Sequence, residues 1–187
     1  TKYIDGQGRA IGGVIVGRAD LIKEIRFFAR QTGPALSPFN AWIFSKSLET
    51  LSIRMDRHCE SAFKLAEWLE KSPHVESVRY PFLKSYPQYE LAKKQMSKGG
   101  GMVSFDIRGG LERGQRFLDA LQVCSLTANL GDSRTIVTHP ASTTHSKLKP
   151  EERKAVSIGD GLVRVSVGLE YIDDIIADIR QAFELSV

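Results

Sequence analysis

The feature that most constrains the fold is an alternation of β-branched runs with amphipathic segments in the part of the chain beyond Pro73. The runs rich in valine and isoleucine are typical of short strands, and the segments with apolar residues three and four positions apart are typical of helices. In chain order we expect a strand at 75–80, a helix at 89–97, a strand at 102–107, a helix at 111–121, a polar stretch at 127–150, a strand at 162–167 and a helix at 172–183. Strands that alternate with helices predict an α/β fold.

The first seventy residues have a different pattern. The run 11–17 is β-branched and bounded by glycines, which predicts a short buried strand. A helix is expected over 19–30 and ends before Gly33-Pro34. A second helix begins at Ser37-Pro38, because serine is a favoured N-cap and proline fits the first helical position.

This second helix is expected to continue to about Lys71 along one apolar stripe: Leu48, Leu51, Met55, Cys59, Ala62, Ala66 and Leu69. A helix of that length can join two lobes of a protein. We therefore place a domain boundary along it, with one unit at 1–60 and a C-terminal α/β domain at 61–187.

Composition limits the function classes. The hydrophobic share of 42% and charged share of 26% are those of an ordinary globular protein. The net charge of +4 does not predict nucleic-acid binding, because acidic residues accompany the basic ones and no dense basic block occurs. No apolar run approaches the ~20 residues of a membrane span, and the start lacks a signal-peptide pattern. We expect a cytoplasmic protein that binds neither nucleic acid nor membrane.

Metal and hydrolase chemistry are not predicted. Cys59 and Cys124 lack CxxC spacing and are expected to be reduced thiols in the core. His139 and His145 belong to no HExxH pattern, and no cysteine or carboxylate set completes a tetrahedral site, so we expect a structural or pocket-rim loop. Ser142 lies in no GxSxG elbow.

Arg164 is the strongest candidate site residue on physical grounds alone. It interrupts the apolar run 161–167, where burying a guanidinium is costly unless it meets an anion. Its planar fork matches a carboxylate bidentately. An exposed arginine on an edge strand is the simpler alternative. Lys2, taken alone, is weak evidence for a site, because an exposed residue next to a chain terminus is the simpler explanation.

Four segments, in order, resemble the Cys/Met-metabolism family of pyridoxal-phosphate (PLP) enzymes. They are the Thr1-Lys2-Tyr3 run with its following glycines, Ala128-Asn129-Leu130-Gly131-Asp132, His139-Pro140-Ala141-Ser142-Thr143-Thr144-His145 and Val163-Arg164-Val165-Ser166-Val167-Gly168-Leu169-Glu170. The likeness covers essentially the whole chain. It implies the C-terminal portion of a fold type I enzyme of the aspartate aminotransferase type, beginning at the Schiff-base lysine. Residues 1–60 would end the large PLP-binding domain, and 61–187 would form the small domain.

The resemblance also implies a role for each candidate. Lys2 would hold PLP covalently and then act as the base, Thr1 would contact the cofactor phosphate, and Asn129 and Arg164 would bind the α-carboxylate of an amino-acid substrate. A free lysine amine with a pKa of about 10.4 is protonated at neutral pH, and a cationic, desolvated setting lowers that pKa. Tyr3 and Arg9 flank the lysine and are candidates for lining the pocket.

The implied activity is γ-replacement that makes homocysteine from O-succinylhomoserine, or O-acetylhomoserine, and sulfide, within methionine biosynthesis. Many relatives carry His-Ser-Asp where this chain has Gln7-Gly8-Arg9, and this departure favours a sulfhydrylase. A cystathionine γ-synthase or a γ-lyase is the alternative within the family. The family further implies a homotetramer, a dimer of dimers, with the N-terminal part of the same enzyme as a partner. A non-catalytic structural fragment is the alternative for the chain in isolation.

Overall fold

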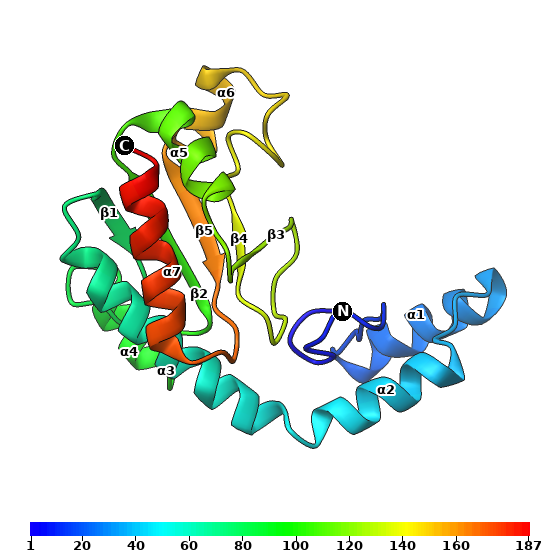
Figure 1. Cartoon of the computed structure of the whole chain (residues 1–187). Coiled ribbons are helices and arrows are strands. Elements are labelled where there is room, and N and C mark those ends of the chain that lie inside the picture. Colours follow the sequence, from blue (N-terminus) through cyan, green and yellow to red (C-terminus); the bar gives the residue numbers. More distant parts are fainter.

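The computed structural model describes all residues from Thr1 to Val187. Figure 1 shows an N-terminal arm of irregular backbone and helices that extends away from a compact body of strands and helices. The arm contains α1 (Ala19–Thr32) and α2 (Pro38–Leu48), and α3 (Leu51–Glu70) leads from the arm into the body. None of the helices combines the length and the apolar character needed to cross a membrane.

A five-stranded sheet forms the centre of the body. Its strands are β1 (Val75–Arg79), β2 (Met102–Ile107), β3 (Ser125–Leu126), β4 (Ile136–Thr138) and β5 (Leu162–Ser166). The spatial order is β1-β2-β5-β4-β3, with antiparallel pairing except between β3 and β4, which are parallel. The other helices are α4 (Tyr89–Gln95), α5 (Gly110–Asp119), α6 (Pro150–Ala155) and α7 (Ile172–Leu185).

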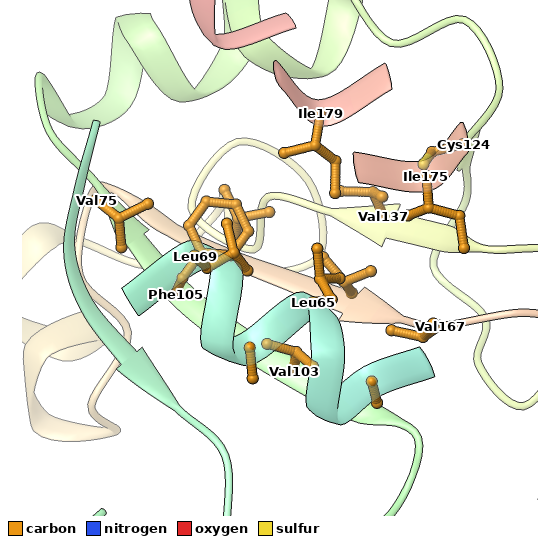
Figure 2. Packing of buried hydrophobic residues seen from close by; sticks show 14 of the residues in the cluster. Leu65, Leu69, Val75, Val103, Phe105, Cys124, Val137, Val167, Ile175 and Ile179 are labelled. Carbon is orange, nitrogen blue, oxygen red and sulfur yellow. The ribbon is translucent and has the colours of Figure 1, made fainter. Parts of the chain in front are cut away.

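The hydrophobic core lies between this sheet and helices α3, α5 and α7. Figure 2 shows side chains such as Leu65, Phe105 and Ile179 meeting in one apolar layer. Residues 103, 105 and 107 of β2, residues 163 and 165 of β5 and Val167 directly after β5 all belong to the core cluster. Because side chains alternate along a strand, the intervening Ser104 and Arg164 lie on the opposite face of the sheet. The core thus determines which residues are left for the other face.

The α/β architecture is confirmed, and so are the strands and helices expected beyond Pro73, with small differences at their ends. Three short elements lie in or beside the polar stretch 127–150 and were not expected: the two-residue β3 just before it, the three-residue β4 within it and α6, which begins at its end. Such short elements contain too few residues to show a periodic pattern.

The strand expected at 11–17 is absent, and this prediction was wrong. The segment has no helix or strand assignment, and its side chains are exposed, with Val16 at 86% of its full accessibility. A strand needs a neighbouring strand to satisfy its backbone, and this segment pairs with none of the five. Its β-branched composition alone therefore does not make it a strand.

The single helix expected from Ser37 to Lys71 is two helices. The Ser37 hydroxyl accepts a hydrogen bond from the Asn40 amide and caps α2 as expected. The break falls at Glu49-Thr50, where the Ser47 carbonyl accepts from the Thr50 amide at 3.3 Å and from Arg54 Nη2 at 3.0 Å. Figure 1 shows the chain bending at this point between α2 and α3.

Candidate functional site

Three of the four site residues expected from the sequence lie together. Lys2 Nζ donates a hydrogen bond to the side-chain oxygen of Asn129, and Arg164 Nη2 donates to the Asn129 backbone carbonyl at 3.4 Å. Lys2 is exposed, whereas Asn129 and Arg164 are half-buried. The N-terminal segment, the loop before β4 and the middle of β5 therefore meet at Asn129, although 127 residues separate it from Lys2.

Gly131 allows this close approach of the loop to the lysine segment. Its φ of +74° is a left-handed conformation that glycine adopts without strain. A Cβ at this position would lie 2.7 Å from the Tyr3 amide nitrogen and 3.0 Å from the Lys2 carbonyl carbon. The Gly131 amide donates to Ser166 Oγ at 2.8 Å, which ties the loop to the end of β5. The loop is thus fixed on both sides.

Arg164 is a cation that no carboxylate of the chain neutralises. Its cross-strand neighbours are Ser104 in β2 and Thr138 in β4, and it forms no salt bridge. The hydroxyl of Thr138 is also buried without a partner. A half-buried guanidinium with donors to spare, on the face of the sheet opposite the core, is suited to a carboxylate ligand.

The turn that follows Lys2 has its own supports. The Gly6 amide donates to the Lys2 carbonyl at 2.8 Å, and the Ser133 amide donates to the Gly6 carbonyl at 2.7 Å. The buried Asp5 carboxylate accepts from the Arg9 and Ala10 amides and from Arg9 Nε. Burial acts to raise the pKa of Asp5, but these donors outweigh it and the pKa lies below its ordinary value.

Arg9 and Thr1 make contacts away from Asn129 and Arg164. Arg9 pairs with Asp5 at 3.0 Å and donates to Ser47 Oγ at 2.8 Å, so it braces the turn against α2. The Thr1 hydroxyl donates to the Gly12 carbonyl and accepts from the Gly12 amide, each at 3.0 Å. Thr1 is therefore the one site residue expected from the sequence that does not join the other three.

The loop from His139 to His145 is tied to the fold through His139, and its Ser142 and Thr143 line a pocket. His139 is fully buried, with Nδ1 2.8 Å from Ser142 Oγ and Nε2 2.7 Å from the Asp160 carbonyl. Burial lowers its pKa, which favours the neutral ring. His145 is half-buried beside Thr144. The chain contains no group of three or more histidine, cysteine or acidic residues that could hold a metal ion.

Two residues of α3 that support the lysine segment were missed. Arg54 donates to the Tyr3 carbonyl at 2.7 Å, and His58 lies edge-on to the Tyr3 ring with 5.3 Å between ring centroids. They are one turn apart on the helix, and the polar residue His58 is fully buried there. A polar pair with four-residue spacing in a helix with an apolar stripe was the available signal.

Comparison with known proteins identifies the family. The model of the Cys/Met metabolism PLP-dependent enzymes matches residues 1–184. The chain belongs to this family. It is 55% identical over 181 residues to an O-succinylhomoserine sulfhydrylase of Pseudomonas aeruginosa, covering 97% of this chain and 45% of the relative. It is 50% identical over 186 residues to an L-methionine gamma-lyase of Porphyromonas gingivalis, covering 98% of this chain and 47% of the relative.

A solved structure described as metB from Corynebacterium glutamicum superposes with a TM-score of 0.89 at 37% identity. The match covers 98% of this chain and 47% of the solved chain. Together with the family match, this identifies the fold as part of a fold type I PLP enzyme. The chain spans about half the length of the relatives it matches.

The residues present fit the cofactor of this family, pyridoxal phosphate. The Lys2 amine is exposed and bonded to a neutral amide rather than a carboxylate, so it is available to a carbonyl group. The left-handed Gly131 keeps the loop beside it free of a side chain. When bound, PLP supplies an electron sink that stabilises negative charge on the substrate's Cα.

Proposed function

We propose that the chain is part of a PLP-dependent enzyme that makes homocysteine from O-succinylhomoserine, or O-acetylhomoserine, and sulfide. The observation that carries the proposal is the meeting of Lys2 and Arg164 at Asn129, where the lysine bonds the side-chain oxygen and the arginine bonds the backbone carbonyl. The 55% identity to an O-succinylhomoserine sulfhydrylase supports the choice of reaction.

Each of these residues has a role that follows from its functional group. Lys2 holds the cofactor, and its freed amine takes the proton from the substrate's Cα and returns a proton during γ-replacement. Arg164 binds the substrate's α-carboxylate through its two parallel donors, and the side-chain amide of Asn129 assists. Thr1 contributes its hydroxyl on the phosphate side of the cofactor. For that contact the Thr1 hydroxyl must rotate, because it now donates its hydrogen bond to the Gly12 carbonyl.

A second reaction has specific support. Several relatives of this chain are L-methionine gamma-lyases, with identities of 47% to 50%. The same three residues serve a γ-lyase or a cystathionine γ-synthase equally well, because the lysine, the amide and the arginine act on the common amino-acid part of each substrate. The Gln7-Gly8-Arg9 sequence, together with Asn129-Leu130-Gly131-Asp132, resembles the sulfhydrylases and favours that reaction.

We further propose a cytoplasmic homotetramer, a dimer of dimers, in which the N-terminal part of the enzyme completes the cofactor site. The 187-residue chain alone is then expected to bind PLP poorly and to be inactive. Absorbance spectra of the purified chain with added PLP test this expectation. A stable visible band of covalently bound cofactor would contradict it.

Product analysis distinguishes the reactions. The protein expressed from its complete gene is incubated with O-succinylhomoserine plus sulfide, with O-succinylhomoserine plus cysteine, and with L-methionine alone. Homocysteine as the main product supports the sulfhydrylase. Cystathionine from the second mixture, or methanethiol from the third, at a higher kcat/KM than homocysteine formation would overturn it.

Replacing Lys2 tests the central role. Lys2→Ala is expected to abolish turnover while leaving the melting temperature nearly unchanged, because the exposed lysine packs little apolar surface. Lys23→Ala, at an exposed lysine of α1, is the matched control and should retain normal turnover. Normal turnover in the Lys2 variant would remove the proposed mechanism.

A further inference from the structure

Arg54 of α3 binds the backbone that follows Lys2. Its Nη1 donates to the Tyr3 carbonyl at 2.7 Å, and its Nη2 donates to the Ile4 carbonyl at 3.2 Å and the Ser47 carbonyl at 3.0 Å. Its Nε donates to Thr50 Oγ1 at 3.2 Å. The guanidinium thus bonds backbone carbonyls of the two residues directly after the lysine and of the last turn of α2, and it forms no salt bridge.

Gly6 leaves the space that this arrangement requires. It closes the turn by donating to the Lys2 carbonyl, with a φ of +72°. A Cβ at Gly6 would collide with the Arg54 guanidinium, with Nη1 as the nearest atom. The lysine turn and the arginine are therefore closely fitted, and the turn cannot shift far while the guanidinium occupies this position.

His58, one turn further along α3, fixes the same segment to the substrate side of the site. Its Nδ1 lies 2.6 Å from the Val167 carbonyl, which requires a proton on Nδ1, and its ring meets the Tyr3 ring edge-on. Val167 follows Ser166, whose hydroxyl accepts from the Gly131 amide. One rigid helix therefore links the backbone of the lysine segment to the strand that carries Arg164.

We propose that Arg54 is a positioning residue for Lys2, which sets the location of the lysine backbone relative to Asn129 and Arg164. The proposal rests on the proposed function, in which the Lys2 amine must reach both the cofactor and the substrate's Cα. A lysine side chain has four flexible bonds, so the position of its backbone decides how often its amine is correctly placed. Arg54 acts through Lys2 and touches neither cofactor nor substrate.

The test compares Arg54→Lys with Arg57→Lys in the protein expressed from its complete gene. Arg57 is half-buried on the same helix and makes no side-chain hydrogen bond, so it is the matched control. Lysine keeps the charge, but a single ammonium group cannot span the carbonyls that the planar guanidinium reaches. Arg54→Gln is the second variant if the first does not fold, as judged by circular dichroism.

Two measurements are made on each protein. Hydrogen–deuterium exchange of the Tyr3–Gly6 amides reports whether the segment is held, without any cofactor. The rate at which PLP added to the apo-protein becomes linked to Lys2, followed by absorbance and by borohydride trapping with mass spectrometry, reports whether the amine is positioned. We expect faster exchange and an about tenfold slower linkage for Arg54→Lys, since misplacement of a reacting group by about 1 Å has large kinetic effects. Arg57→Lys should match the wild type.

The outcomes are distinct. Faster exchange with an unchanged linkage rate would reduce Arg54 to a structural role and overturn the proposal, as would equal effects in the two variants. A wild-type protein that forms no linkage at Lys2 would overturn the proposed function instead. In that case an exchange rate unaffected by Arg54→Lys would overturn the positioning role independently.

Discussion

No carboxylate of the chain pairs with the charge of Arg164. We therefore expect Arg164→Lys to weaken binding of the substrate's α-carboxylate. An ammonium cannot reproduce two parallel bonds to a carboxylate. Losing one charge-assisted bond costs about 1.5–3 kcal/mol, which corresponds to a KM raised roughly ten- to hundredfold. Steady-state kinetics beside a thermal melt measure the effect, with Arg26→Lys on the exposed surface of α1 as the control. Unchanged kinetics with a lowered melting temperature would refute the carboxylate role.

Gly131 gives a residue-scale prediction about stability. Gly131→Ala places a Cβ against the Tyr3 amide and the Lys2 carbonyl carbon in a left-handed conformation. Such strain typically costs about 1–3 kcal/mol, and we expect at least that decrease in the free energy of unfolding, measured with urea. Gly13→Ala is the matched control, because a Cβ there meets no atom within 4 Å. Equal stability of the two variants would show that the loop relaxes without cost.

The site residues differ in how far the sequence could reveal them. Arg164 could be proposed physically, because a charge within an apolar strand calls for an anion. Lys2 and Asn129 were predictable only by resemblance, since a lysine and an asparagine in polar segments have many ordinary explanations. Arg54 and Gly131 were not predicted, because their roles depend on contacts with residues about 50 and 128 positions away along the chain.

At the scale of elements, Asp178 ties α7 to the loop that follows α5. Its buried carboxylate accepts hydrogen bonds from the amides of Gln122, Val123 and Cys124 at 2.9–3.0 Å. Burial acts to raise the pKa of Asp178, but the backbone donors outweigh it, so the pKa lies below its ordinary value. A carboxylate with a lowered pKa stabilises the fold in its ionised form.

Asp178→Asn should therefore destabilise the fold in a pH-dependent way. Near pH 7 we expect a loss of about 1.5–3 kcal/mol, because bonds to a charged acceptor are lost. The difference from the wild type should be complete above about pH 5 and should shrink as the pH falls below about 4 towards the lowered pKa of the folded state. Urea unfolding at several pH values measures it. Glu184→Gln, at an exposed position of the same helix, is the control. A difference that does not depend on pH would contradict this account.

Elements were predictable where local pattern and tertiary packing agree. In α7 the residues Ile172, Ile175, Ile179 and Phe183 recur at helical spacing and all are buried in the core. The segment 11–17 has strand composition but no neighbouring strand, so pattern and packing disagree. At the break between α2 and α3, Arg54 donates a hydrogen bond to the Ser47 carbonyl. The spacing of apolar residues cannot predict such a contact.

At the scale of the whole molecule, apolar surface is distributed unevenly. Every member of the core cluster lies between Ala62 and Phe183. Among the first fifty residues only Asp5, Gly6, Ala10, Ile43 and Ser47 are buried. Many large apolar side chains of the arm are exposed, including Val14, Phe28 and Trp42. Exposed apolar surface on this scale is typical of an interaction site. The arm therefore contributes little to the stability of the body.

This asymmetry leads to a prediction about domain organisation. We propose that the C-terminal unit, expected from residue 61, also includes the first half of α3, because α3 is one unbroken helix from Leu51 to Glu70. A fragment of residues 49–187 should unfold cooperatively, with a melting temperature within about 4 °C of the whole chain, since 1 kcal/mol shifts the melting temperature of a chain this size by about 2–4 °C.

A fragment of residues 72–187 lacks Ala62, Leu65, Ala66 and Leu69 of the core and should not fold. Calorimetry and circular dichroism of the two fragments provide the measurement. A non-cooperative 49–187 fragment would show that the arm is an integral part of the folding unit, and a folded 72–187 fragment would show that α3 belongs with the arm.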